Sequence, residues 1–277
     1  MNKLLNVTIE DFRYIQKFVK EISGIHLEED KTYLIESRLS HIIEGEKFPS
    51  FKELIFKLRN ENFNGFHQKI IEAMTTNETS FFRDVHPFET FKNFILPEFI
   101  EKRKYEKNIK IWSAACSTGQ EPYSIAMILN EKFGNVFGWN VNIKASDISA
   151  EMISRCKCGS YNCLEISRGL SNDMLERYFS KKENNWIIKD ELKNMIDFFQ
   201  MNLVSEWPFD NKIDVIFMRH VLIYFDIETR KNIMAKIKKI IKPDGYLILG
   251  VGETTYNIDE DFECVQIDKT SCYKLKT

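Results

Sequence analysis

The chain has 277 residues, of which 43% are hydrophobic and 29% are charged, a composition typical of a folded chain with a real core and not of a disordered one. Its 39 Lys and Arg against 41 Asp and Glu give a net charge of −2, which argues against nucleic-acid binding driven by overall charge. No signal-like apolar segment follows Met1 and no apolar run could cross a bilayer, so we expect a cytoplasmic protein without membrane insertion.

Residues 1–75 predict an all-helical N-terminal domain. Thr8 and Asp11 have the spacing of a capping box, and apolar residues recur at helical intervals from there to Gly24. Three more helices are predicted, over 30–44, from the Ser50–Glu53 cap through Leu58, and over 65–74. Residues 1–75 hold 11 Lys and Arg against 12 Asp and Glu, so this domain is not basic.

Residues 76–90 predict a linker, because TTNETSFFRD, which ends at Asp84, is rich in Thr and Asn and breaks the helical pattern. A helix carrying Phe88, Phe91, Phe94 and Ile95 follows. From Ile109 onward short apolar runs alternate with helices, which indicates a parallel sheet. The strands are expected at 109–114, 141–147, 213–218 and 246–250, and the helices after Gln120, after Ser149 and over 228–241.

The rest of this second domain, 91–277, is less regular. KPDG at 242–245 predicts a helix-to-strand turn, and WIIK at Trp186 and MIDFFQ at Met195 predict short strands of a small antiparallel insert at about 178–200. Cys156, Cys158 and Cys163 lie close in sequence, but no fourth ligand is nearby, so free thiols are favoured over a zinc site and no metal is expected.

The loop after the first strand, SAACSTGQEPYS, carries one glycine, Gly119, where a phosphate-binding fingerprint has three. It offers instead the carboxylate of Glu121, and Asp147 ends the second strand. An acid at this edge repels phosphate and suits a ligand with an ammonium group and hydroxyls, such as S-adenosylmethionine. Taken singly, Glu121 is equally consistent with a charge favoured by the helix dipole and Asp147 with a helix cap.

The chain resembles the bacterial chemotaxis receptor methyltransferases of the CheR type. The resemblance covers nearly the whole chain, through TTNETSFFRD, WSAACSTGQEPYSIAM, ASDIS, MNL, IFMRHVLIYFD and KPDGYLILG in the family's order. It implies an α/β fold, a Rossmann-like S-adenosylmethionine-dependent methyltransferase domain with a small β insert behind the all-α domain. It also implies methyl transfer to glutamate side chains on the cytoplasmic helices of chemoreceptors, with S-adenosylhomocysteine as the product.

The resemblance also implies the site residues. Arg83 and Tyr224 are expected close to the transferred methyl group. The cofactor contacts are expected from both the linker and the strand ends: Asn77, Thr79, Arg83, Glu121, Asp147, Asn202, Leu203, Arg219 and His220.

Three positions depart from the family pattern. His220 stands in Arg219-His220-Val221 where the family usually has RNV, and an imidazole is bulkier than an amide and titrates near neutrality. The second helix, basic in many relatives, keeps Arg38 as its one clear match. The segment from Lys181 to Trp186 lacks the glycine that accompanies tethering to a receptor's C-terminal pentapeptide, so tethering is not expected.

A glutamate carboxylate is ionised at neutral pH, so the predicted reaction requires no general base. Arg83 is suited to grip that carboxylate through two hydrogen bonds. Two other hypotheses stay open. One is a module that binds S-adenosylmethionine as a sensor or scaffold without transfer, and the other is methylation of a small molecule or nucleic acid on the same fold. The neutral N-terminal domain disfavours nucleic acid, and the linker motif disfavours a small-molecule enzyme.

Overall fold

The computed structural model describes residues 7–133, 138–209 and 212–276 and divides into two compact units. The first unit comprises Met1–Thr76 and Tyr224–Thr229, and the second comprises Asn77–Ile223 and Arg230–Thr277. Within the described part of the chain, no helix is both long and apolar enough to cross a membrane.

The first unit is all-helical, as predicted. The capping box of Thr8 and Asp11 is present at the start of its first helix, which ends at Gly24 in the left-handed conformation (φ 76°). Ser50 caps α3 by accepting a hydrogen bond from the backbone of Glu53. The elements are α1 (Ile9–Ser23), the 3-10 helix η1 (Glu29–Lys31), α2 (Thr32–Gly45), α3 (Phe51–Asn60) and α4 (Gly65–Met74).

The short segment 224–229 belongs to this helical unit through polar contacts with the end of α1 and the residues after it. Phe225 forms an isolated antiparallel bridge with Ile25, and the His26 amide donates to the Tyr224 carbonyl oxygen at 2.8 Å. Lys20 Nζ lies 2.7 Å from the Asp226 carboxylate. The chain therefore enters the first unit twice.

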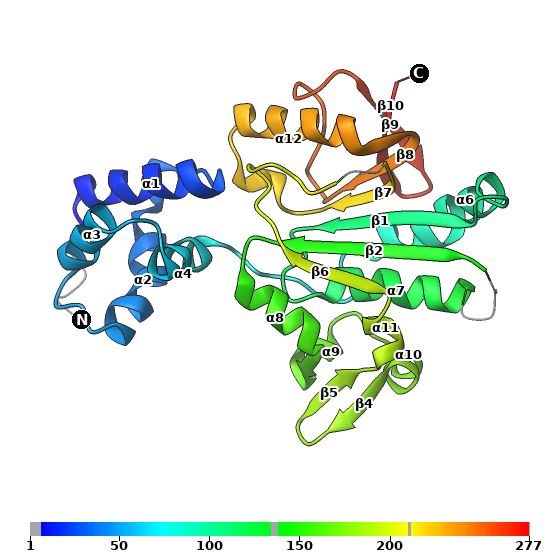
Figure 1. Cartoon of the computed structure of the whole chain (residues 1–277), viewed down its shortest axis with the longest axis horizontal. Coiled ribbons are helices and arrows are strands. Elements are labelled where there is room, and N and C mark those ends of the chain that lie inside the picture. Colours follow the sequence, from blue (N-terminus) through cyan, green and yellow to red (C-terminus); the bar gives the residue numbers. More distant parts are fainter. Residues whose placement is uncertain (1–6, 134–137, 210–211, 277) are drawn as a thin grey trace. The chain divides into compact units, whose positions relative to one another are not determined.

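The second unit is built on a seven-stranded sheet in the order β6-β2-β1-β7-β8-β10-β9. Figure 1 shows β7, β1, β2 and β6 side by side. The pairs from β6 to β8 are parallel, and β10 and β9 run antiparallel at the far edge. The strands are β1 (Asn108–Ala114), β2 (Asn140–Asp147), β6 (Ile196–Gln200), β7 (Ile213–Met218), β8 (Ile241–Leu249), β9 (Phe262–Ile267) and β10 (Thr270–Leu275).

Every residue of β7 is buried, as expected of a central parallel strand covered on both faces. Helices α7 and α8 pack against β2 and β6. The helical elements of this unit are α5 (His86–Thr90), the π-helical turn η2 (Phe91–Ile95), α6 (Leu96–Lys102), α7 (Gln120–Phe133), α8 (Ala150–Cys158), α9 (Cys163–Ser167), α10 (Asn172–Tyr178), α11 (Asp190–Lys193) and, outside Tyr224–Thr229, the 3-10 turn η3 (Leu222–Tyr224) and α12 (Ile227–Ile240). The α/β fold class predicted from the sequence is confirmed.

The predicted insert exists but has different members. Its sheet has the order β3-β5-β4, from β3 (Ser160–Asn162), β4 (Phe179–Lys182) and β5 (Asn185–Ile188), and in Figure 1 its β4–β5 hairpin lies beyond α9 and α10. The MIDFFQ strand, β6, instead pairs parallel with β2 in the main sheet. The insert thus ends near residue 188, and assigning it up to 200 was wrong, because isolated apolar runs carry no signal for their pairing partner.

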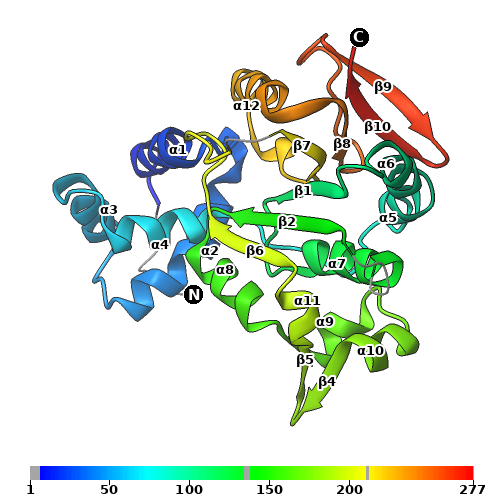
Figure 2. The ribbon, with the colours of Figure 1, turned by 45° about the vertical axis from the view of Figure 1, so that its right-hand side comes forward.

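The KPDG prediction was also wrong. Lys242–Gly245 lies inside β8, and the register of β7 against β8 moves from Ile213–Ile241 to Val215–Tyr246. The segment therefore forms an irregularity in the ladder where a separate turn was expected. The β9–β10 hairpin, which forms the sheet edge beside β8 in Figure 2, was not predicted.

Candidate functional site

The loops after β1, β2, β6, β7 and β8 share one edge of the sheet because these strands are parallel. Chain order reverses between β1 and β7, since the chain proceeds from β1 to β2 and β6 and then returns to β7 on the other side of β1. Loops diverge at such a reversal and leave a crevice, which is where ligands bind in open α/β sheets.

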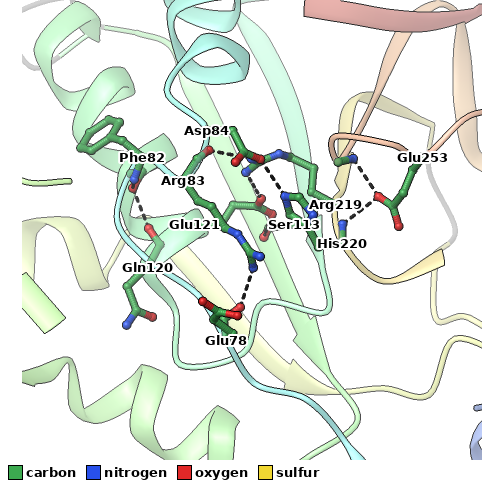
Figure 3. A network of polar contacts seen from close by, with 12 residues as sticks. Glu78, Phe82, Arg83, Asp84, Ser113, Gln120, Glu121, Arg219, His220 and Glu253 are labelled. Carbon is green, nitrogen blue, oxygen red and sulfur yellow. Dashed lines mark hydrogen bonds and ion pairs between the residues drawn. The ribbon is translucent and has the colours of Figure 1, made fainter. Parts of the chain in front are cut away.

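Arg219, directly after β7, is the centre of the polar network at this edge (Figure 3). Its side chain is 1% exposed. Nη1 donates to Glu121 Oε2 at 2.8 Å, and Nη2 donates to Asp84 Oδ2 at 2.8 Å and to the carbonyl oxygen of Arg83 at 2.6 Å. The other Glu121 oxygen accepts from Ser113 Oγ at 2.7 Å. One guanidinium is thus shared by two carboxylates, which leaves one negative charge in excess.

The Nε–H of Arg219 is buried and has no acceptor among the described residues. A buried donor without a partner costs about 1–3 kcal/mol. This donor therefore suits a ligand that brings an acceptor, such as a carboxylate, to the edge of the sheet.

His220 adopts a left-handed backbone conformation with φ 57°, which is uncommon for a residue with a side chain. Its Nε2 lies 2.7 Å from Asp84 Oδ2. The imidazole that the family pattern placed on the cofactor thus contacts the linker. Burial opposes ionisation of Asp84, but the hydrogen bond from His220 and the charge of Arg219 together outweigh it and hold the pKa of Asp84 below its ordinary value.

Asp147 ends β2 and is 6% exposed. Its carboxylate accepts backbone hydrogen bonds from Ser117 (2.8 Å) and Ser149 (3.0 Å), which joins the loop after β1 to the start of α8. A carboxylate has about four acceptor positions, so it can also accept from ligand hydroxyls.

The loop after β1 is tightly folded, with Ala115 (φ 55°), Ser117 (φ 51°) and Gly119 (φ 95°) all in the left-handed region. At Gly119 a Cβ atom would come within 3.0 Å of Cys156 Sγ. Gly119 therefore serves backbone conformation and close packing against α8. This use of the glycine fits a site without a phosphate cradle.

The linker is attached to this edge by its backbone. The carbonyl oxygen of Asn77 accepts from Ser117 Oγ at 2.8 Å, and the Phe82 amide donates to Ser124 Oγ at 3.0 Å. Arg83 Nη1 donates to the Glu78 carbonyl oxygen at 2.6 Å, so its side chain extends toward Glu78 (Figure 3). Thr79 lies in the same loop and is half-buried.

Asn202 and Leu203 lie in the loop after β6. Asn202 Oδ1 accepts from the Val204 amide at 3.1 Å. Lys236, on α12, donates to the carbonyl oxygens of Leu203 (3.1 Å), Val204 (2.8 Å) and Ser205 (2.6 Å). This lysine therefore holds the loop that presents two of the predicted cofactor residues.

Tyr224 is half-buried and belongs to the first unit, whereas Arg83 belongs to the second. Its role beside Arg83 stays a prediction. Among the predicted residues, the structure joins Glu121, Arg219, His220 and the Arg83 backbone in one network.

Two acidic members of the network were missed by the sequence reasoning. Asp84 follows Arg83 directly, and Glu253 follows β8. Glu253 carried a usable signal, since a polar residue just after a parallel strand reaches the ligand edge. Asp84 carried none, because its partners are 135 and 136 residues away.

Comparison with known proteins points to one family. The family model described as "CheR methyltransferase, all-alpha domain" matches residues 10–75, and "CheR methyltransferase, SAM binding domain" matches residues 77–271. The chain is 38% identical to chemotaxis protein methyltransferase Cher2 of Pseudomonas putida, over 96% of this chain and 98% of that protein. It is 37% identical to chemotaxis protein methyltransferase 1 of Pseudomonas aeruginosa over the same shares, and 37% identical to the chemotaxis protein methyltransferase of Borreliella burgdorferi over 91% of each.

Proposed function

The chain belongs to the CheR methyltransferase family, and from this premise we propose that it is a cytoplasmic protein-glutamate O-methyltransferase acting on the cytoplasmic helices of chemoreceptors. Its cofactor is S-adenosylmethionine, as for the family's SAM binding domain. The observation that carries the proposal is the network around Arg219, where two carboxylates share one guanidinium whose Nε–H has no acceptor in the described part of the chain.

The residues present fit this cofactor. The excess negative charge suits a cationic ligand, the Arg219 Nε–H suits its carboxylate, and Asp147 suits its ribose hydroxyls. Asn77, Thr79, Asn202, Leu203 and His220 are the remaining proposed contacts. When bound, S-adenosylmethionine supplies a methyl group already activated by its sulfonium.

The acceptor is proposed to be a glutamate carboxylate, which has an ordinary pKa of about 4.3 and is ionised at neutral pH. The chain's own residues then need to position the carboxylate and exclude water. Arg83 is suited to this task, because a guanidinium has five N–H donors and pairs with a carboxylate through two parallel hydrogen bonds. Tyr224 is the second residue that the family resemblance assigns to the transferred methyl group, and its role is part of this proposal.

We infer that this chain does not use a receptor tether. Its β4–β5 connection is a two-residue turn, Glu183 and Asn184, with Glu183 in the left-handed conformation (φ 55°). The family resemblance links tethering to a glycine-bearing loop at this place, and the segment from Lys181 to Trp186 holds no glycine. The proposed substrate is therefore recognised through the methylated helices themselves.

The test is incubation with labelled S-adenosylmethionine and receptor cytoplasmic fragments, followed by release of the label in base. Base-labile label on glutamate is the expected result. Binding of S-adenosylhomocysteine without any transfer would favour the sensor or scaffold alternative.

Arg83→Ala should lower the transfer rate about 30- to 100-fold, since it removes a charge-assisted pair worth about 2–3 kcal/mol. The fold should survive, because Arg83 is half-buried on a loop. The matched control is Arg168→Ala, which removes an exposed arginine of the same unit and should transfer at the parental rate. Equal rates for Arg83→Ala and the parent would refute the clamp.

A further inference from the structure

Glu253 is a buried carboxylate, 8% exposed, that accepts hydrogen bonds from three backbone amides. Oε2 accepts from His220 and from Gly250, both at 2.7 Å, and Oε1 accepts from Ile223 at 3.2 Å. Two of these donors lie in the loop after β7 and one in the loop after β8. Figure 3 shows Glu253 beside His220, on the side away from Glu121.

Hydrogen bonds from neutral amides to a charged acceptor are stronger than those between neutral pairs. Three of them compensate the cost of burying the carboxylate. Glu253 is therefore held by the backbone of the Arg219–Ile223 loop, and it holds that loop in return.

The two loops meet without a side chain between them. A Cβ atom on Gly250 would lie 2.6 Å from the His220 amide nitrogen and 2.8 Å from both His220 Nδ1 and Glu253 Oε2. Glycine at 250 thus leaves the space in which the Glu253 carboxylate reaches the His220 amide.

The amide that Glu253 holds belongs to the left-handed residue of the loop, His220 (φ 57°). Such a conformation persists only where its surroundings enforce it. Arg219 precedes it directly, and its guanidinium must reach Glu121 and Asp84 together. A small change of the loop backbone would move all of these contacts.

We propose that Glu253 is a positioning residue for the cofactor site: it fixes His220 in the left-handed conformation and thereby aims Arg219. The inference rests on the proposed function where Arg219 and His220 are taken as cofactor contacts. Its test measures S-adenosylhomocysteine binding. Because this binding needs no receptor, its outcome is independent of whether the chain methylates glutamate.

Glu253→Ala should weaken S-adenosylhomocysteine about tenfold or more by calorimetry on the full chain, because three amides lose their charged acceptor. Glu253→Gln should lose less, about threefold, because its amide oxygen can still accept from His220 and Gly250 while its NH₂ group faces the Ile223 donor. The control is Glu263→Gln, an exposed glutamate on β9, which should bind at the parental affinity. The KM for S-adenosylmethionine should rise in both Glu253 variants while the KM for the receptor fragment stays unchanged.

A second pair of variants isolates the backbone conformation. His220→Gly and His220→Ala both lose the imidazole, but only glycine adopts φ > 0 at little cost. With Glu253 intact, the two should differ modestly in affinity for S-adenosylhomocysteine. In the Glu253→Gln background, the affinity of the alanine variant for S-adenosylhomocysteine should drop further below that of the glycine variant, by about threefold or more.

Parental affinity in folded Glu253→Ala, or the same glycine-to-alanine ratio in both backgrounds, would overturn the proposal. If Glu253→Ala does not fold, the decision rests on the His220→Gly and His220→Ala variants made in the Glu253→Gln background, since glutamine keeps the size of the side chain. A uniform loss of affinity with an unchanged ratio would show that Glu253 only supports the fold.

Discussion

At the scale of single residues, Asp84 connects the linker to the loop after β7. One of its oxygens, Oδ2, lies 2.8 Å from Arg219 Nη2 and 2.7 Å from His220 Nε2. The His220 ring therefore faces a carboxylate of the linker. This contact is specific to a chain with histidine at 220, because an asparagine there would be shorter and uncharged.

Asp84→Asn should lower the free energy of unfolding by about 1–2 kcal/mol at pH 7. The effect is this small because the Asp84 side chain is 28% exposed, so solvent screens its interactions with Arg219 and His220. The pKa of Asp84 is lowered in the folded state, so its contribution is present above the unfolded value of about 3.9 and is lost as pH falls through the folded value. Urea unfolding of both proteins from pH 7 down to about pH 3.5 measures this. A difference in unfolding free energy that grows toward acid pH would contradict the assignment, because the contribution of Asp84 can only shrink as pH falls.

Much of the candidate site was predicted, but for two different reasons. Glu121 and Asp147 follow from strand ends and from the missing phosphate glycines, which are local features. Arg83, Arg219 and His220 came from resemblance alone. The ion pair between Glu121 and Arg219 was not predicted. The two residues are 98 positions apart in the sequence and come together only once the sheet has formed.

At the scale of elements, Asp214 joins three elements at the amino end of the sheet. It lies in β7, is fully buried, and accepts from the Lys110 amide of β1 at 2.9 Å. Arg103, after α6, lies 3.1 Å from its Oδ1, and Lys242 of β8 lies 2.8 Å from the same oxygen. Asp214 thus performs at the opposite edge the kind of joining that Glu253 performs beside the candidate site.

Asp214→Asn should lower the free energy of unfolding by about 3 kcal/mol, because it leaves two cations with a weakened partner in a buried place. S-adenosylhomocysteine affinity should stay within about twofold of the parent, since the change is at the amino end of β7.

Asp244→Asn is the control, because its carboxylate is 34% exposed and also pairs with Arg103, and it should cost about 1 kcal/mol. Denaturant titration and calorimetry read the two quantities separately. A loss of affinity equal to the loss of stability would contradict the division between the two edges.

The elements themselves were predictable where periodicity was long. The helix α4 and the strand β7 appear with the predicted bounds, 65–74 and 213–218. The failures concern pairing: β6 has a strand pattern but no local sign of its parallel partner β2. KPDG has a turn composition, yet the β7–β8 ladder absorbs it as an irregularity. Tertiary context decides both cases.

At the scale of the whole molecule, the chain has two units, and the first carries no excess of basic residues. The one basic residue matched on α2, Arg38, donates to the carbonyl oxygens of Met74 (2.5 Å) and Thr75 (3.1 Å) and to Thr76 Oγ1 (2.7 Å). Its guanidinium therefore secures the end of α4 and the start of the linker. An electrostatic attraction between α2 and an acidic receptor helix has little charge left to act through.

Receptor methylation by this chain should consequently depend only weakly on salt. Contacts between exposed opposite charges weaken as the screening length falls from about 10 Å at 0.1 M to about 3 Å at 1 M. Because residues 1–75 carry no excess of basic residues, the KM for the receptor fragment should change less than about threefold between about 0.05 and 0.5 M sodium chloride. The KM for S-adenosylmethionine, measured in the same series, corrects for any effect of salt on the cofactor site.

A gain-of-charge variant provides the positive control. Ser37 and His41 are both exposed and stand four residues apart on α2, so Ser37→Arg with His41→Arg places two charges on one helical face. If α2 faces the receptor, this variant should bind the fragment more tightly at low salt and lose the advantage as salt rises. A parental KM that already rises tenfold with salt would mean that an attractive charged surface exists elsewhere on the chain. A charged variant without new salt dependence would instead mean that α2 does not meet the receptor, because added charge at a true docking face must register in the low-salt affinity.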